Sequence, residues 1–420
     1  MVSIMKFTQC VKDTCVYTKI SKNNNIIMFG LFVDDITTFY DVHDEHEYNV
    51  YINMLKQKYE MSDLGDVHNI LGMRVTNRDD GLYLDQHTYI EEKLKYFNMI
   101  NCNPMSTPES TTKLSSISND NNNNNNNNDI INEYRSIVGS LIYAAISTRP
   151  DINHAVNMVS RYMHNPTHDH MIAAKRILRY MSCTKDICIK YNKNTNSNNK
   201  NVSHEKYVKN KNNNNEKQNI CTNNFDVDTH EYEVDNESMS TMMTQEIVKE
   251  DIHKNKNNNN NKNIINVKAF CDADWGGDHE DRKSTTGYCV FINDNVVSWN
   301  TQKQKTVALS SAEAEYMSGS DVVKELLWLR MILNEMKYDV VLPIIVYCDN
   351  QSAIRMIEND VDHSRTKHID IKYNFLRETV KKGIVRFEWI STKEQVADIF
   401  TKGLSKEIYE KLRDKLVNRL

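Results

Sequence analysis

The chain has 420 residues, more than a typical single domain, with a net charge of −5 and a mean hydropathy of −0.65. This acidic balance excludes a basic surface over the whole chain, so a nucleic-acid site would have to be a local basic patch. The nine cysteines include no C-x-x-C pair, which disfavours a zinc module and a disulfide framework. No apolar run approaches the length of a membrane span and no signal peptide opens the sequence, so we expect a cytoplasmic or nuclear protein.

The first 110 residues mix short strand patterns with amphipathic helix patterns. Within them, the stretch GLFVDDITTFY places Asp34 and Asp35 between two apolar runs. This pattern predicts a β-hairpin whose tip carries charge. From the residues alone, the pair is either an ordinary turn or a metal-binding pair, because two carboxylates are costly to bury without partners.

Two polar segments interrupt the chain, a connector over residues 111–131 that contains the run Asn121–Asn128, and an Asn- and Lys-rich segment over residues 192–265. Neither has enough apolar residues to offset the entropy of ordering, so we expect both to be disordered linkers. Self-association through the Asn runs is the alternative. Between these linkers, residues 132–191 carry three helical patterns with apolar residues three and four apart.

From residue 266 onward the pattern becomes compact again. The predicted elements are strands over 267–275, 287–294 and 296–303, a long helix over 310–333, a strand over 343–350, helices over 351–359 and 369–382, a strand over 384–391 and a closing helix over 393–404. A helical tail follows over 405–420. Strands alternating with helices in this way predict a layered α/β domain.

Four acidic residues of this C-terminal region form a candidate set. They are Asp272, Glu315, Asp349 and Asp398. Each alone could be a helix cap or an exposed strand end, but together they provide the carboxylates that two-metal phosphodiester hydrolysis requires. The neighbouring Glu313 stands three residues after Ser310, as in a capping box, and therefore has a structural role. We accordingly favour Glu315 as the ligand.

Five blocks of this region resemble, in order, the ribonuclease H domain of copia-type LTR retrotransposon Pol polyproteins. They are FCDADWGGDHEDRKSTTGYCVF, VVSWNTQKQKTVALSSAEAEYMSGS, VYCDNQSAI, RTKHIDIKYNFLRE and EQVADIFTKGL, spread over residues 266–404. The resemblance implies a ribonuclease H-like fold, a mixed five-stranded sheet with flanking helices. It also implies that the four acids hold two Mg²⁺ ions, with Mn²⁺ as a substitute.

Two features qualify this resemblance. Cellular ribonucleases H carry a mobile His shortly before the last Asp, whereas this sequence has none between Ile369 and Asp398, so another group or water would transfer the proton. A DDE integrase or transposase, with Asp272, Asp349 and Glu388 as its triad, is the rival within the same fold. It is disfavoured because RFEWIS alternates like a strand, whereas such enzymes usually carry that Glu on a helix.

Six basic residues are candidates for contacts with a nucleic-acid backbone. They are Arg282, Lys283, Lys303, Arg365, Lys367 and His368. The alternative is an ordinary solvated surface. The substrate that the resemblance implies is an RNA–DNA hybrid, recognised through its backbone and 2′-hydroxyl groups. The resemblance also implies association with other retroelement Pol or Gag products, and no membrane partner.

The N-terminal part resembles copia-type reverse transcriptase. FVDD is similar to the YVDD signature, and the neighbouring MSDLGDVHNILGMRV, MSTPES and YRSIVGSLIYAAISTRPDINHAVNMVSRYM follow in family order. Residues 1–110 would be a partial palm and thumb and residues 132–191 the thumb and connection helices, an α+β region. Asp34 and Asp35 would then be remnants of the polymerase Mg²⁺ site.

The third metal-binding Asp and the fingers of the family lie upstream of FVDD, and neither is present in this sequence. We therefore expect a truncated element, a gene-model fragment or a segment of a longer protein, with no independent polymerase activity; incorporation in a primer-extension assay would refute this. The leading functional prediction is ribonuclease H activity on RNA–DNA hybrids. The alternative is a catalytically inactive relic or a nucleic-acid-binding fragment.

Overall fold

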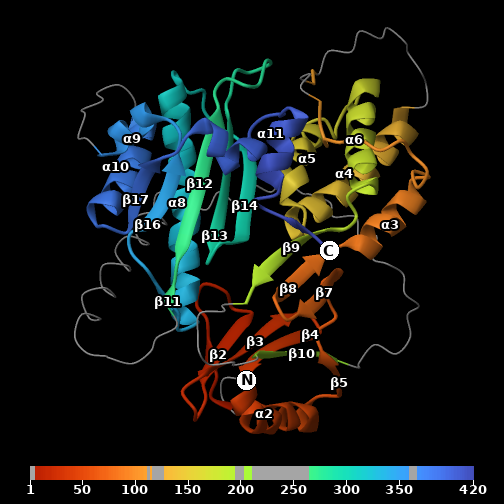
Figure 1. Ribbon diagram of the computed structural model, residues 1–420, viewed down its shortest axis with the longest axis vertical. Helices are drawn as coiled ribbons and strands as arrows, with labels where there is room; N and C mark the ends of the chain where they lie inside the picture. The colour runs from red at the N-terminus through yellow and green to blue at the C-terminus, as the bar shows by residue number, and fades with distance from the viewer. Residues whose placement is uncertain (1–4, 111–113, 116–126, 194–202, 211–263, 359–366) are drawn as a thin grey trace. The chain divides into compact units, whose positions relative to one another are not determined.

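The computed structural model describes residues 5–110, 114–115, 127–193, 203–210, 264–358 and 367–420 (Figure 1). The described parts divide into two compact units, one drawn from residues 1–67, 195–264 and 327–340, the other from 68–194, 265–326 and 341–420. Among the described residues, every helix is too short or too polar to cross a bilayer.

The first unit is a six-stranded antiparallel sheet backed by one helix. The strands, in spatial order, are β1 Thr8–Gln9, β2 Val16–Ile20, β3 Ile26–Phe32, β4 Asp35–Asp41, β10 Ser203–Asn210 and β5 Met61–Asp66. Helix α2, Glu45–Lys58, packs its buried face on this sheet. The core is largely aromatic, with the rings of Tyr40 and Tyr48 stacked 4.0 Å apart. The predicted hairpin is confirmed as β3 and β4.

The polar linkers are shorter than the sequence predicts. Residues 203–210 form strand β10, paired with β4 on one side and β5 on the other, where we expected disorder. The reason is non-local, because β10 supplies backbone hydrogen bonds to two strands that would otherwise expose an edge. Helix α4, Asn127–Ser147, likewise begins inside the expected connector. The rest of both Asn-rich segments lies mostly outside the described residues.

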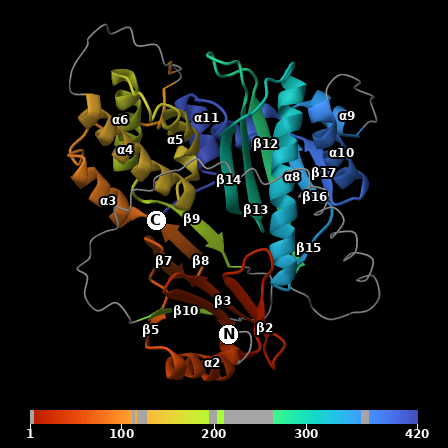
Figure 2. The same ribbon diagram turned by 180° about the vertical axis from the view of Figure 1, so that it is seen from behind.

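The second unit contains the mixed five-stranded sheet that the sequence predicts. Its strands, in spatial order, are β14 Asn295–Lys303, β13 Thr285–Ile292, β12 Val267–Asp274, β16 Ile344–Cys348 and β17 Val385–Trp389. The first three are antiparallel, and β12, β16 and β17 are parallel. Helix α8, Ser311–Glu335, lies across one face (Figures 1 and 2). Helices α9, Gln351–Glu358, and α10, Lys367–Lys381, provide the crossover from β16 to β17. The order β14-β13-β12-β16-β17 is the ribonuclease H-like arrangement.

A second sheet and a group of helices complete this unit. The sheet contains β18 Asn418–Arg419, β9 Ile187–Asn192, β8 Gly81–Asp85, β7 Met73–Arg78 and β6 Asn69–Ile70. The helices are α3 His87–Tyr96, α4, α5 Asn153–Ser160 and α6 His168–Ser182. One hydrophobic core joins them to the five-stranded sheet, since Leu141 of α4, Phe291 of β13 and Phe400 belong to the same buried cluster. The segments before and after the long polar linker therefore fold together.

A buried ion pair in the stretch TRPDI stabilises this shared core. Arg149 donates to both oxygens of Asp151, at 2.9 and 2.8 Å, and both side chains are fully buried. The hydroxyl of Tyr180 on α6 donates to the same carboxylate, and that of Tyr409 donates to the Asp151 carbonyl. Because three separate segments of the chain meet at this pair, TRPDI has a structural role here.

The predicted closing helix over 393–404 is wrong. The structure has two 3₁₀ turns instead, η3 Thr392–Glu394 and η4 Val396–Phe400, followed by helix α11, Lys406–Arg413. The break falls at Gln395, whose backbone is extended (φ −67°, ψ 101°) and whose fully buried amide donates to the carbonyl of Cys271 on β12. This tertiary contact outweighs the local helical pattern.

Candidate metal centre

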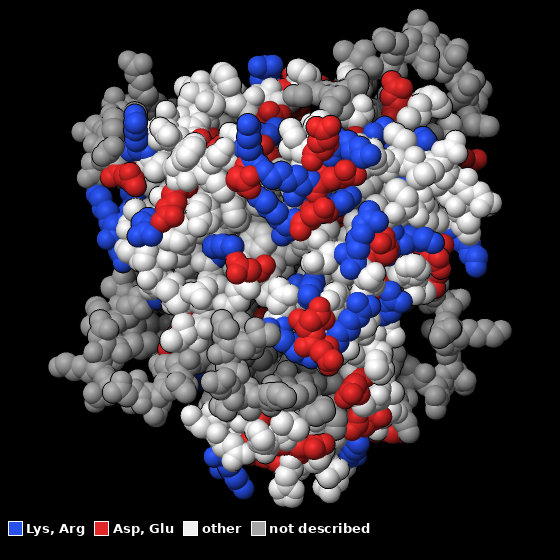
Figure 3. Space-filling view, viewed as in Figure 1, with Lys and Arg blue, Asp and Glu red and all other residues white. Residues whose placement is uncertain are grey.

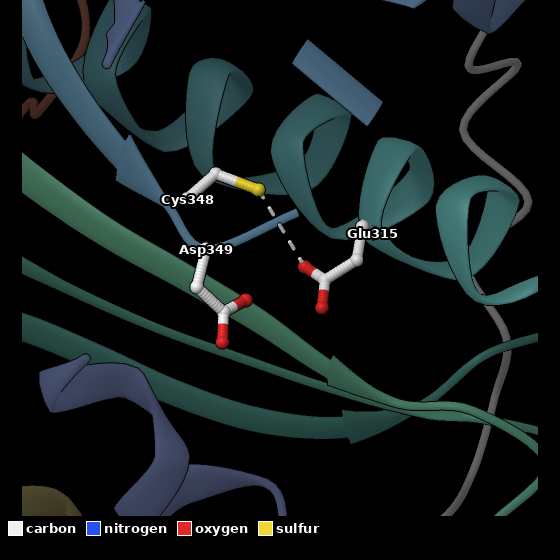
Figure 4. Close-up of side chains that lie close together, drawn as sticks. All are labelled: Glu315, Cys348 and Asp349. Atoms are coloured by element: carbon white, nitrogen blue, oxygen red, sulfur yellow. Dashed lines mark hydrogen bonds between the residues drawn. The ribbon is translucent and has the colours of Figure 1, made fainter. Parts of the chain in front are cut away.

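The four acids that the sequence singles out meet at one end of the five-stranded sheet. Asp272, Asp349 and Asp398 each offer a carboxylate oxygen, and these oxygens lie within 4.8 Å of one another. Glu315, Cys348 and Asp349 form a second group of the same compactness (Figure 4). Because Asp349 belongs to both groups, the four acids form a single cluster, which we call the acid cluster.

The parallel pairing of β12 and β16 explains why two of the acids lie side by side. Phe270 of β12 is in register with Tyr347 of β16. Asp272 and Asp349 stand two residues further along each strand, at the carboxyl end where sheets of this kind place ligands. The Thr392 hydroxyl donates to Asp349 at 2.7 Å and orients its carboxylate.

The turn η4 brings the third acid against β12. The side-chain oxygen of Gln395 accepts from the backbone of Ala397, while its amide is bonded to β12 as described above. The hydroxyl of Thr401 donates to the Asp272 carboxylate. Gln395 and Thr401 therefore position the acid cluster, and sequence reasoning missed both. Their only signal was their place in the block EQVADIFTKGL.

Gly287 on β13 makes the close approach of η4 possible. It pairs directly with Asp272 in the ladder. A Cβ atom at this position would lie 2.6 Å from the Thr401 side chain and 2.7 Å from Cβ of Phe400, and 3.0 Å from the Phe400 backbone. A residue without a side chain lets η4 pack this closely on β13, next to the strand that carries Asp272.

The start of α8 separates the two glutamates as the sequence predicts. Ser310 accepts from the backbone N–H of Glu313 at 3.2 Å, and the Glu313 carboxylate turns back to accept from Leu309 at 2.7 Å. Glu315 instead faces the cluster, where the Cys348 thiol lies 3.9 Å from its carboxylate (Figure 4). Glu313 thus caps the helix, and Glu315 is the glutamate that joins the other acids.

Burial and mutual repulsion perturb the acid cluster. Burial, reinforced by the negative charge of Asp272, raises the pKa of Asp398 to about 7. The same causes raise the pKa of Glu315 well above its usual range, and burial raises the pKa of Asp349. A bound cation would therefore stabilise the charged form of these carboxylates. Their hard oxygen atoms are the donors that Mg²⁺ prefers, so the residues present fit such an ion.

One cationic side chain enters the cluster, and sequence reasoning did not find it. The Lys402 ammonium lies 3.0 Å from Oδ1 of Asp398 and 3.4 Å from Oδ2 of Asp272. Burial alone would lower the pKa of this amine, but the two carboxylates raise it overall. Lys402 thus offsets negative charge on Asp272 and Asp398, the two acids that it contacts.

A cavity of about 670 Å³ opens beside the cluster within the same unit. Thr401 and Lys402 line it on the sheet side. His154 of α5, Arg161 directly after this helix and Arg176 of α6 also line it. Space therefore exists next to Lys402 for its side chain to move or for a ligand to approach.

The predicted backbone-binding residues are only partly described. Lys303 lies 2.6 Å from Asp278 and 2.9 Å from Asp281, and Lys283 lies 3.6 Å from Asp281, so both belong to a network of acids and bases. Arg282 lies in the same loop with a positive φ of 59°. Figure 3 shows basic and acidic side chains interspersed on the face drawn. Arg365, and the side chains of Lys367 and His368 on α10, lie outside the described residues.

The other acids considered as metal ligands, Glu388, Asp34 and Asp35, do not belong to the acid cluster. Glu388 is on strand β17, as its alternating pattern indicates, and accepts from Arg386 at 2.6 Å. The hairpin turn consists of Val33, with a φ of 52°, and Asp34, while Asp35 begins β4. Within the part of the chain that the structure describes, no metal-binding group of three or more ligands includes these residues.

Comparison with known proteins agrees with this organisation. The family described as "Reverse transcriptase (RNA-dependent DNA polymerase)" matches residues 1–111. The Pol polyprotein of transposon RE1 from Arabidopsis thaliana is 31% identical over 98% of the chain. The chain covers only 23% of that polyprotein's length.

Two further proteins match parts of the chain. An uncharacterised mitochondrial protein of Arabidopsis thaliana, AtMg00810, is 32% identical over 67% of the chain and 85% of its own length. The solved N-terminal RNase H domain of a Mycobacterium tuberculosis protein aligns with 35% of the chain and 97% of its own, at 15% identity and a TM-score of 0.25. At these values the solved structure assigns no residue roles.

Proposed function

Because the chain belongs to the copia-type retrotransposon Pol family, we propose that residues 266–404 hydrolyse the RNA strand of RNA–DNA hybrids. Its N-terminal part is related to reverse transcriptase, and its C-terminal part has a ribonuclease H-like fold. The observation that carries the proposal is the convergence of Asp272, Glu315, Asp349 and Asp398. Four acids from four separate elements meet where each would be costly without a cation.

The residues of the acid cluster have distinct parts in this proposal. The four acids would hold two Mg²⁺ ions, which would supply activation of a water and stabilisation of the leaving oxygen. Asp349 would contribute to both metal positions, because it belongs to both ligand groups. Thr392 and Thr401 hold the carboxylates of Asp349 and Asp272 in place by hydrogen bonds, so less reorganisation is needed when the ions bind.

Substrate recognition in this proposal depends on shape and charge, because ribonucleases that act on hybrids contact the backbone and the 2′-hydroxyl groups. The basic candidates are Arg282, Lys283, Lys303, Arg365, Lys367 and His368. Lys283 and Lys303 already pair with acids, so a phosphate would have to replace Asp281 as their partner. We accordingly expect hybrid binding to weaken as salt increases.

The test uses the purified full-length chain with a hybrid, a duplex RNA and a duplex DNA of the same sequence. We expect Mg²⁺-dependent cutting of the RNA strand in the hybrid only. Asp272→Asn should abolish cutting, whereas Asp294→Asn, which changes an acid with a side chain 78% exposed in the turn between β13 and β14, should retain it. Equal cutting of duplex RNA, or no cutting with Mg²⁺ or Mn²⁺, would favour the inactive relic instead.

A further inference from the structure

The position of Lys402 within the acid cluster carries an inference beyond the hydrolytic activity. Its ammonium lies within ion-pair distance of Asp272 and Asp398, two of the three acids of one ligand group. It follows Asp398 by four residues, and the intervening η4 turn is fixed against β12 and β13 by Gln395 and Gly287. The lysine is therefore held at this place by the same contacts that assemble the acids.

We propose that Lys402 is a tethered cation that occupies the metal position between Asp272 and Asp398 and must be displaced before a divalent ion binds there. This inference rests on the proposed function, because it concerns the metal site of the same cluster. The ammonium and a metal ion compete for the same oxygens, notably Oδ1 of Asp398, which belongs to a buried carboxylate and lies 3.0 Å from the ammonium. Two cations sharing these oxygens would also repel each other.

The structure provides a path for this displacement. The Lys402 side chain is 35% exposed, whereas the carboxylates of Asp272 and Asp398 are 3% and 5% exposed. Lys402 also lines the cavity of about 670 Å³, so the ammonium can leave the acids without moving the backbone. The carboxylates remain in place because Thr401 and the η4 contacts hold them.

Two consequences follow for metal binding. Lys402 partly neutralises the acids when no metal is present, so it stabilises the assembled cluster. It also weakens metal affinity, because the ion must break two ion pairs before it can bind. The site would therefore remain closed to divalent ions until their concentration is high enough to compete with an intramolecular cation.

The first test measures Mg²⁺ binding by isothermal titration calorimetry on the full-length chain. Lys402→Met retains the aliphatic length and removes the charge, and we expect its Mg²⁺ dissociation constant to fall at least about fivefold. Lys406→Met removes the same charge from an exposed position at the start of α11 and should leave the constant unchanged. In the absence of metal, Lys402→Met should also melt at a lower temperature than Lys406→Met.

The second test needs no substitution at Lys402, so it does not depend on a variant that folds. Lysine acylation in the wild-type chain is measured by mass spectrometry, with and without Mg²⁺, and Lys406 serves as the internal reference. We expect Mg²⁺ to increase the acylation rate at Lys402 several-fold relative to Lys406, since the released amine faces the cavity. An unchanged or lower rate would overturn the proposal.

The possible results separate this inference from the proposed function. If Lys402→Met binds Mg²⁺ with wild-type affinity while the chain cuts hybrids, the tethered-cation role is wrong and the proposed nuclease activity is supported. If Mg²⁺ binds to neither protein, both are wrong. Tighter binding by Lys402→Met supports the inference even if the chain cuts no hybrid.

Discussion

The substitution Asp398→Asn offers a direct measure of the electrostatic cost of the acid cluster. Burial and the charge of Asp272 raise the pKa of Asp398 in the folded chain to about 7. In the unfolded chain an aspartate titrates near pH 4. Between these values the folded chain holds a proton that the unfolded chain has lost, so the free energy of unfolding falls as pH rises through this window.

The magnitude follows from the size of the shift. One pKa unit is worth about 1.4 kcal/mol, so a shift of about three units corresponds to about 4 kcal/mol once pH exceeds 7. The neighbouring carboxylates share this cost because their titrations interact. We therefore expect Asp398→Asn, which has nearly the same shape and no charge, to stabilise the metal-free chain by about 2–4 kcal/mol near pH 8 and to have little effect near pH 4.

Magnesium should reverse the order of stability. The wild type gains about 2.7 kcal/mol when the free ion reaches a hundredfold excess over its dissociation constant, whereas Asp398→Asn loses a ligand and should gain little. The assay is urea unfolding near pH 4 and pH 8, with EDTA or Mg²⁺. Tryptophan fluorescence is a suitable probe, since Trp275, Trp299 and Trp389 belong to the unit that holds the site.

Two results would refute this reasoning. If Asp398→Asn destabilises the metal-free chain near pH 8, the carboxylate is stabilising and its raised pKa is wrong. If Mg²⁺ stabilises the wild type and Asp398→Asn equally, Asp398 is not a ligand. Asp294→Asn is the control, because this exposed residue lies outside the acid cluster and its substitution should leave the response to Mg²⁺ unchanged.

Three further predictions test the structural basis of the site. Arg149→Met should lower the free energy of unfolding, measured in urea, by about 3–5 kcal/mol because it leaves the buried carboxylate of Asp151 without its cation. Adding Asp151→Asn should recover part of this loss. Gly287→Ala should lower the free energy of unfolding by about 1–3 kcal/mol and reduce the Mg²⁺-induced stabilisation, since its methyl group would push η4 away from β13 and disturb the bond from Thr401 to Asp272; wild-type behaviour would contradict the role given to this glycine. Asp34→Asn combined with Asp35→Asn should leave hybrid cutting unchanged in the nuclease assay, and a loss of cutting would tie the hairpin to the site.

Most elements after residue 266 and the helices of residues 132–191 could be predicted from the sequence, because apolar spacing within ten or twenty residues is enough to specify a strand or a helix. The sequence also identified the acids that meet, and it separated Glu315 from Glu313 through a local capping pattern that the structure confirms. The hairpin around Asp34 followed from the same local reasoning.

Features that depend on distant contacts could not be predicted from the sequence. Strand β10 forms in a polar segment because two other strands bond to it, and η4 replaces a helix because Gln395 bonds to a neighbouring strand. No sequence pattern marks Lys402 as the cation of the acid cluster, since its position relative to Asp272 depends on packing between segments 130 residues apart. Such contacts arise only when the chain folds, and here they determine which charge lies between the acids.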